Sequence, residues 1–191
     1  MAGFSGPDGV VYTLDHLASS EVVIAVKVGD EELQVPLWVV YRNHCYSRDY
    51  AYGKDGDEEL EWRLPDEPGE RSIRLFCRDR WAYSHSLPAV VKAVLFASKC
   101  FRTTNRGLYY KFDRASKVQA GSYEGIYLFF KFARNRYNHA GLMLSVESVH
   151  ERTTLPMNDR GRQQTTFKIA LIEFLKDNPD ILEEIRKAKG P

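Results

Sequence analysis

A chain of 191 residues with 43% hydrophobic and 28% charged side chains can bury a full hydrophobic core, which excludes disorder over most of its length and indicates one domain. Its three cysteines are widely spaced and form no CxxC pair, so we expect no metal site and reduced thiols in the cytoplasm. No segment approaches the roughly 18 consecutive apolar residues of a membrane span, so we expect no membrane contact.

The formal net charge of +1 hides an uneven distribution along the chain. Residues 1–71 carry fifteen acidic and six basic side chains, whereas residues 72–136 carry thirteen basic and three acidic ones. If the basic segment lies on one surface, it suits a polyanion such as RNA. The alternative is that the two segments neutralise each other in the fold or across a dimer.

The N-terminal part is predicted to begin with a loose leader over residues 1–20, which glycine and proline interrupt, and a single domain follows over residues 21–191. Residues 21–28 and 32–41 are rich in β-branched side chains and flank a Gly-Asp turn, a pattern that predicts a β-hairpin. Residues 53–71 are acidic and are broken by glycine and proline, so we predict a surface excursion there without a packed element.

The middle of the chain is predicted to contain a strand over residues 72–78 and then one helix. Ser86 can cap the first free N–H groups of that helix, and Pro88 is tolerated in its first turn. We expect the helix to end near Cys100.

Three strands and two helices are predicted for the remaining residues. Apolar side chains alternate over residues 108–112, 126–133 and 142–146, and the second of these segments is apolar on most of both faces, so we expect it at the centre of the sheet. Residues 165–178 predict a helix, and the Asn-Pro pair that ends it starts a second helix to about Ala188. The whole order predicts an α+β fold with a mainly antiparallel sheet, an N-terminal hairpin, one central helix and two C-terminal helices.

No motif in the sequence names a reaction. The patterns GxxxxGK[ST], GxGxxG, GxSxG and HExxH are all absent, which removes support for a nucleotide cofactor, a serine nucleophile elbow and a zinc protease helix. We therefore expect no cofactor. The candidate sites are clusters of arginine, histidine and aromatic side chains at the predicted ends of strands and at the start of the helix.

The first cluster is RNHCYSR, residues 42–48, which directly follows an apolar strand. It places Arg42, His44 and Arg48 within one loop, and loops that a rigid scaffold holds often carry sites. The alternative is a structural loop whose arginines pair with acidic neighbours. Cys45 fits the role of a small buried hydrophobic residue better than that of a nucleophile.

The second cluster is CRDRWAYSHS, residues 77–86, which leads into the predicted central helix. Arg78, Arg80 and His85 are close to a helix N-terminus, which favours anions. Trp81 can stack on nucleic-acid bases, or, as the structural alternative, it anchors the helix in the core.

A third cluster surrounds the turn between two later strands, with Arg134 and Arg136 in the turn and His150 and Arg152 at the end of the following strand. Histidine titrates near neutrality and arginine stabilises phosphate charge, so these residue types suit a metal-independent ribonuclease. The candidates for proton transfer are His44, His85 and His150. The candidates for nucleic-acid binding are Arg42, Arg48, Arg78, Arg80, Trp81, Arg134, Arg136 and Arg152.

The order RNHCYSR, RWAYSHSLP at a helix start, Cys100, YLFFKFAR and LMLSVESVHERT resembles a bacterial family whose members occur on mobile elements and are sometimes labelled stationary-phase growth adaptation proteins. The resemblance covers about residues 20–170 and implies no particular activity or catalytic residue. The predicted architecture is also similar to that of the small metal-independent ribonucleases that include RelE-type toxins and barnase. That similarity concerns the fold and implies no function by itself.

Two functions remain open. The first hypothesis is an RNA- or polyanion-directed protein of a phage or mobile element, in its most specific form a toxin-like, metal-independent endoribonuclease. The alternative is a non-catalytic protein of a mobile element that binds or inhibits a host factor through its acidic surface, centred on Glu58, Glu59 and Glu61. Burial discriminates between them, because a buried and paired RNHCYSR loop removes most of the support for the ribonuclease. The sequence leaves the oligomeric state open.

Overall fold

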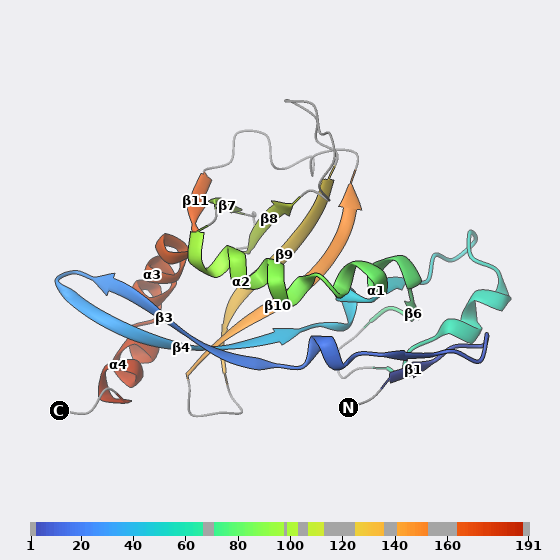
Figure 1. The fold of residues 1–191 in the computed structure, drawn as a ribbon, viewed down its shortest axis with the longest axis horizontal. Coiled ribbons are helices and arrows are strands. Elements are labelled where there is room, and N and C mark those ends of the chain that lie inside the picture. The colour runs from blue at the N-terminus through green and yellow to red at the C-terminus, as the bar shows by residue number, and fades with distance from the viewer. Residues whose placement is uncertain are drawn as a thin grey trace.

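The molecule is built on one large sheet (Figure 1). The computed structural model describes residues 3–66, 71–97, 99–102, 107–112, 125–135, 141–152 and 164–188. The strands of the main sheet in this part of the chain are β3 (Ser20–Val28), β4 (Glu31–Tyr41), β7 (Lys99–Arg102), β8 (Leu108–Phe112), β9 (Gly125–Arg134), β10 (Leu142–Arg152) and β11 (Gln164–Thr166). Their spatial order is β11-β7-β8-β9-β10-β4-β3, and neighbours are antiparallel except β10 and β4, which run parallel.

The sheet confirms the predicted α+β class and the central place of the 126–133 segment. β9 lies between β8 and β10, and both of its faces are covered, because Tyr127 and Leu128 point to opposite faces and are both buried. β9 and β10 form an antiparallel pair in which Arg134 lies opposite Leu142, as the short turn predicts. The sequence does not predict the short strands β7 and β11, because so few residues carry no readable periodicity.

β3 and β4 form the predicted N-terminal hairpin at one edge of the sheet. Gly29 opens the two-residue turn with a φ of +65°, a conformation that residues with a Cβ rarely adopt. Along β3, Ile24 and Val26 are buried while Val23 is exposed, so the strand alternates between the core and solvent. The hairpin therefore presents one apolar face to the rest of the molecule.

Three helices pack against the sheet and complete the core. They are α2 (Leu87–Ala97), α3 (Phe167–Asp177) and α4 (Pro179–Ala188). α3 contacts α2 and β3, and α4 contacts β4. The two C-terminal helices confirm the prediction, including the break at Asn178 and Pro179, and the Thr166 hydroxyl caps α3 by accepting a hydrogen bond from the Ile169 N–H at 3.2 Å. No helix within the described ranges has the length and apolar character needed to cross a membrane.

The predicted central helix is present as α2, and a separate short helix that the sequence did not predict, α1 (Arg78–Ser84), precedes it. The Ser86 hydroxyl, directly before α2, donates a hydrogen bond to the Tyr83 carbonyl at the end of α1. Pro88 does lie in the first turn of α2, as expected.

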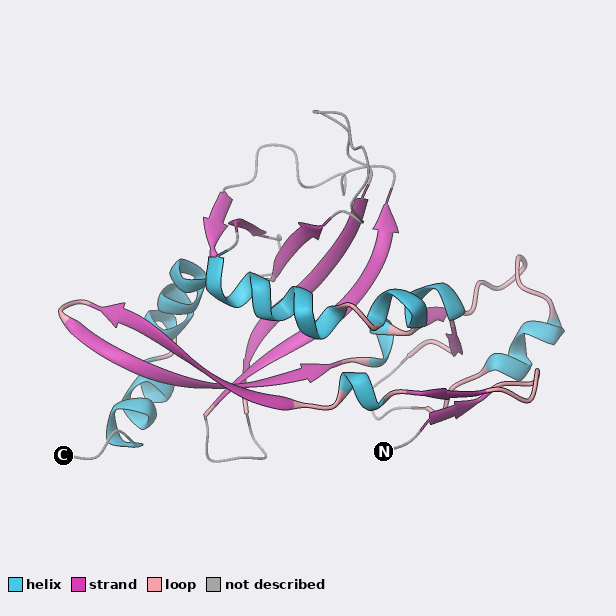
Figure 2. Cartoon of the chain, viewed as in Figure 1, coloured by secondary structure: helices cyan, strands magenta, loops and turns pink. Residues whose placement is uncertain are grey.

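A smaller lobe extends from the main sheet at the end opposite the β3–β4 turn (Figures 1 and 2). This N-terminal lobe contains β1 (Gly3–Ser5), β2 (Val11–Thr13), β5 (Ser47–Asp49), the 3₁₀ helix η3 (Asp57–Trp62) and β6 (Arg74–Phe76). Its own core is aromatic, with Tyr12 and Phe76 buried against Phe4, Trp62 and Trp81. The rings of Phe4 and Phe76 stack with their centroids 4.7 Å apart.

Two predictions for the N-terminal part of the chain differ from the structure of this lobe. Residues 3–13 form an antiparallel hairpin of β1 and β2 instead of a loose leader. The acidic segment, which is predicted as an excursion without a packed element, contains η3. In both cases an aromatic side chain stabilises a segment whose own sequence does not predict an ordered element. Tyr12 and Trp62 pack into the aromatic core of the lobe.

Candidate functional site

The RNHCYSR loop lies around Arg74 of β6. Arg74 is only 3% exposed. Its Nη2 donates to the Ser47 carbonyl oxygen at 2.8 Å and its Nη1 to Asp49 Oδ1 at 2.6 Å. Its Nε and Nη2 also reach the Ser47 hydroxyl, at 3.1 and 2.9 Å. The loop is thus held from inside by a buried guanidinium group.

Arg48 is neutralised within the same lobe. Its Nη1 lies 2.6 Å from Asp55 Oδ2, and its Nη2 lies 2.7 Å from Glu59 Oε2. The hydrogen bond from Arg48 lowers the pKa of the Asp55 carboxyl below its usual value, so the carboxylate stays charged and paired. A predicted phosphate-binding residue is therefore engaged by two carboxylates.

Arg80 completes the support of the loop from α1. Its Nη1 donates to the carbonyl oxygens of Ser47, at 2.5 Å, and His44, at 3.3 Å. Burial lowers the pKa of Arg80 from its ordinary value. The guanidinium group satisfies backbone acceptors of a loop in which Asn43 and Ser47 are buried.

Cys45 is a buried part of this framework. Its Sγ lies 3.4 Å from the Val146 carbonyl oxygen of β10, to which it donates a weak hydrogen bond. Burial raises the pKa of the Cys45 thiol to about 12. The thiol is neutral at physiological pH and is unsuited to act as a nucleophile.

Arg78 and Trp81 anchor α1 on the β1–β2 hairpin. Arg78 Nη2 lies 2.8 Å from Asp8 Oδ2, and the guanidinium carbon lies 4.4 Å from the centroid of the Trp62 ring. Trp81 Nε1 donates to the Thr13 carbonyl oxygen at 3.0 Å. This arrangement matches the structural alternative for Trp81. Arg78 and Arg48 nevertheless meet at a pocket of about 320 Å³ that Trp62 also lines.

His85 stacks on a histidine that the sequence reading passes over. The rings of His16, in η1 (Asp15–Leu17), and His85, directly after α1, lie 3.8 Å apart. His16 Nε2 lies 2.6 Å from Ser84 Oγ, and that hydroxyl donates to the Trp81 carbonyl at 2.7 Å, so His16 is the donor to Ser84. Ser84 is fully buried and its proton is engaged, so this pair is a structural contact and not an activated nucleophile.

The elements that carry the three candidate histidines lie beside one another. His44 lies in η2 (Asn43–Cys45), and η2, α1 and β10 contact one another. His150 and Arg152 belong to β10, where they pair with Tyr127 and Gly125 of β9. The side chains of His150 and Arg152, and the whole of Arg136, lie outside the described residues.

The two remaining arginine candidates differ in their surroundings. Arg134 forms ion pairs with Asp180 and Glu184 of α4, so it joins the sheet to the last helix. Arg42 is exposed, and its side chain forms no ion pair with any residue that the structure describes. Among the arginine candidates whose side chains are described, Arg42 is thus the one without a carboxylate or carbonyl partner.

The acidic segment places carboxylates on the outside of the lobe. Asp57, Glu58 and Glu61 of η3 are exposed and form no ion pair within the described ranges, and we call these three residues the acidic face. Glu59 differs, because it binds Arg48. The charge of this segment is visible in the sequence. No sequence pattern, however, distinguishes Glu59, which binds Arg48, from the exposed carboxylates of the acidic face.

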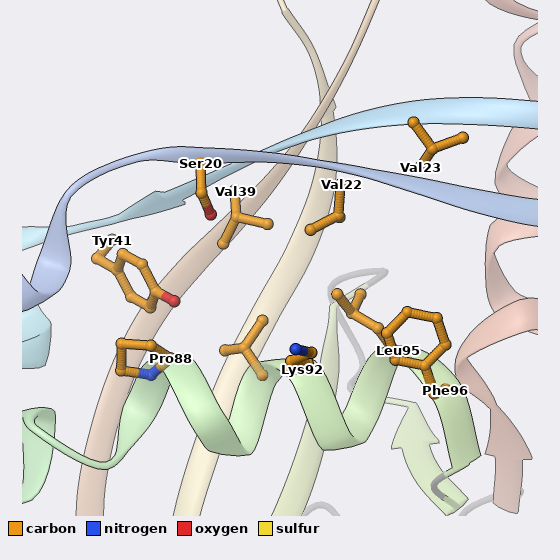
Figure 3. Close-up of a pocket in the computed structure, with 10 residues that line it drawn as sticks. Ser20, Val22, Val23, Val39, Tyr41, Pro88, Lys92, Leu95 and Phe96 are labelled. Atoms are coloured by element: carbon orange, nitrogen blue, oxygen red, sulfur yellow. The ribbon is translucent and has the colours of Figure 1, made fainter.

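A groove of about 340 Å³ lies between α2 and the β3–β4 hairpin (Figure 3). Its lining is mostly apolar, and it includes Val22 and Val23 of β3 and Leu95 and Phe96 of α2. Tyr41 lies at one end of the groove, and burial raises the pKa of its hydroxyl to about 12. The two walls of this groove come from segments that are distant in the sequence, so no sequence pattern predicts it.

In the described part of the chain, no group of three or more His, Cys, Asp and Glu side chains is arranged so that it could hold a metal ion. Neither the curated proteins nor the solved structures contain a match to this sequence. The model of the YjaZ family matches residues 4–175, which includes the N-terminal lobe, the whole described sheet and most of α3. The chain therefore belongs to the YjaZ family.

Proposed function

We propose that this chain is a non-catalytic interaction protein that binds a positively charged surface of a partner protein through its acidic face. One observation carries the proposal: the three carboxylates of the acidic face are exposed on η3 and have no ion-pair partner among the described residues. Arg48, Arg74 and Arg78, in contrast, each pair with a carboxylate of the lobe. Within the RNHCYSR loop, Asn43, Cys45 and Ser47 are buried and Arg48 pairs with two carboxylates, which favours this function over catalysis. The origin on a mobile element and the inhibition of a host factor stay predictions.

The acidic face is displayed on a fixed support. Trp62 packs into the aromatic core of the lobe, and Leu64 directly after η3 is buried. A fixed surface loses little conformational entropy on binding. Acidic residues in the first turn stabilise a helix, but Glu61 lies near the end of η3, where the helix dipole gives an acidic residue no benefit. Binding of a cationic partner therefore explains the acidic side chain at position 61 better than stabilisation of η3 does.

The test is capture of a partner from a bacterial lysate at low salt, followed by reconstitution with the identified, purified partner. E58Q/E61Q removes two charges of the acidic face, and D30N/D177N removes two exposed, unpaired carboxylates elsewhere. We expect E58Q/E61Q to weaken binding roughly twofold to thirtyfold and D30N/D177N to leave it unchanged. Equal affinities for the two variants would contradict the proposal.

A metal-independent endoribonuclease is the second candidate. His44 lies in η2, His85 directly follows α1, and His150 lies in β10. These three elements contact one another. In this function the histidines exchange protons, and Arg42, which has no described partner, holds phosphate.

Labelled single-stranded RNA and tRNA are incubated with the protein in EDTA, and the products are resolved on a denaturing gel. The ribonuclease predicts cleavage that joint replacement of His44, His85 and His150 by glutamine abolishes. Intact RNA after prolonged incubation, or cleavage that survives the triple replacement, would exclude this mechanism.

A further inference from the structure

β3 ends the main sheet, and the turn that follows it fixes which of its backbone groups face outward. In a two-residue hairpin the residues that flank the turn form a hydrogen-bonded pair, here Val28 and Glu31. Hydrogen-bonded and non-hydrogen-bonded pairs then alternate along the strands. Val23 and Pro36 fall in a non-hydrogen-bonded pair, which agrees with the absence of an N–H group in proline.

The alternation leaves a row of free groups on the outer edge. The N–H and C=O groups of Glu21, Val23, Ala25 and Lys27 point away from β4, and none of them has a hydrogen-bond partner among the described residues. β3 contains neither a proline nor a bulge, which are common protections of an edge strand. Val23 is 52% exposed on the outer face of this strand.

We infer that this edge pairs with β3 of a second copy of the chain, antiparallel and with a two-fold axis at Ile24. In that register Glu21 lies opposite Lys27 of the second copy, and Lys27 lies opposite its Glu21. Both side chains are exposed, and neither forms an ion pair with a described residue. The strand is therefore complementary in charge to its own two-fold image.

Strand length selects the same register. Ser20–Val28 has nine residues and Ile24 at its centre, so only this axis pairs every residue of both strands. It also brings the outward groups of Val23 opposite those of Ala25, as hydrogen bonding between the copies requires. A shift by one pair in either direction takes Glu21 and Lys27 out of register with each other. Charge, length and backbone direction thus agree on one arrangement.

The groove beside the edge continues the surface that the second copy covers. Val23 and Phe96 both line the groove, and Phe96 is 59% exposed. Exposed apolar side chains beside an unpaired strand mark an interaction surface. The second copy joins two seven-stranded sheets into one continuous sheet and shields this apolar rim from water.

Charge reversal tests the pairing by sedimentation equilibrium of the whole chain. E21K places two lysine pairs across the axis, and we expect the dimer to dissociate at least roughly tenfold more readily. The double variant E21K/K27E restores opposite charges and is expected to restore the dimer. Within one chain, residue 21 lies opposite Trp38 and residue 27 lies opposite Glu32. K27E would therefore also place two acidic side chains opposite each other in the same chain, so E21K is the cleaner single variant.

Val23→Pro removes only an outward N–H group, so it abolishes the dimer while leaving the β3–β4 ladder intact. Circular dichroism checks that each variant is folded. Amide hydrogen exchange gives a second readout, in which Val23 and Ala25 gain protection as protein concentration rises. A chain that stays monomeric, a dimer that E21K and Val23→Pro leave unchanged, or edge amides that only a different protein protects would each overturn the inference.

Discussion

Arg74 is the residue around which the RNHCYSR loop and β6 are assembled. A buried arginine is tolerated only when its N–H groups have acceptors, and here the Ser47 carbonyl, the Ser47 hydroxyl and Asp49 supply them. The same bonds satisfy backbone and hydroxyl oxygens that are themselves buried. Arg74 thus holds the loop from β6, in addition to the hydrogen bonds that Arg80 and the loop's own Ser47 and Cys45 supply.

Replacing Arg74 by methionine leaves the buried Ser47 hydroxyl without its donor and Asp49 without its arginine partner, so we expect the free energy of unfolding to fall by about 1–3 kcal/mol. Urea unfolding measures it. Arg63, which is exposed and pairs only with Asp66, provides the matched control, and Arg63→Met should change the free energy of unfolding by less than about 0.5 kcal/mol. Similar losses for the two variants would show that Arg74 does not hold the lobe together.

The sequence indicated which clusters of arginines are candidate site residues, but it could not indicate the groups with which these arginines pair. Alternation over residues 72–78 favours burial of one face of the strand, yet Arg74, Leu75 and Phe76 are all buried. Consecutive buried residues require cover on both faces of β6, and this cover includes Ser47 beside Arg74 and the rings of Phe4 and Tyr12 beside Phe76, which come from distant segments. The stacking of His16 on His85 could not be predicted for a similar reason, because the two residues lie far apart in the sequence.

At the scale of elements, the stacked histidines join η1 to the end of α1. Burial, and secondly the neighbouring His85, lower the pKa of His16, while Asp15 acts in the opposite direction. A histidine with a lowered pKa in the folded state binds its proton less readily than in the unfolded state. Its contribution to stability is complete above about pH 6.5, the unfolded pKa, and is lost as the pH falls below it.

We therefore predict that acidification destabilises the wild-type chain more than His16→Gln, which keeps a side-chain N–H donor for Ser84 but does not titrate. Urea unfolding at about pH 7.5 and about pH 5.5 measures the difference, since histidine titrates between these values. Carboxylates titrate in both proteins and cancel in the comparison. An identical pH dependence for the two proteins would show that the histidine stack has no such effect.

Elements with long periodic patterns were predictable, and those held by remote partners were not. β3, β4, β9, β10 and α3 follow their patterns of alternation or helical period. α1 and the β1–β2 hairpin are short, and aromatic contacts between distant segments stabilise them, such as that between Tyr12 and Trp81. The groove could not be predicted because it exists only where α2 meets the hairpin.

At the scale of the whole molecule, the charge division along the chain is partly resolved inside the fold. Arg74 and Arg78 come from the basic segment and bind Asp49 and Asp8 of the acidic segment. These pairs agree with the expectation that the two segments neutralise each other. The acidic face on η3 has no ion-pair partner among the described residues, and it favours a cationic partner over RNA at this place on the surface.

Side-by-side binding of a labelled oligoarginine peptide and a labelled single-stranded RNA, measured by fluorescence anisotropy at low salt, tests this conclusion most directly. The account predicts that the peptide binds more tightly than the RNA, that E58Q/E61Q weakens peptide binding, and that D30N/D177N does not. Tighter binding of the RNA, with no response of either ligand to E58Q/E61Q, would contradict it.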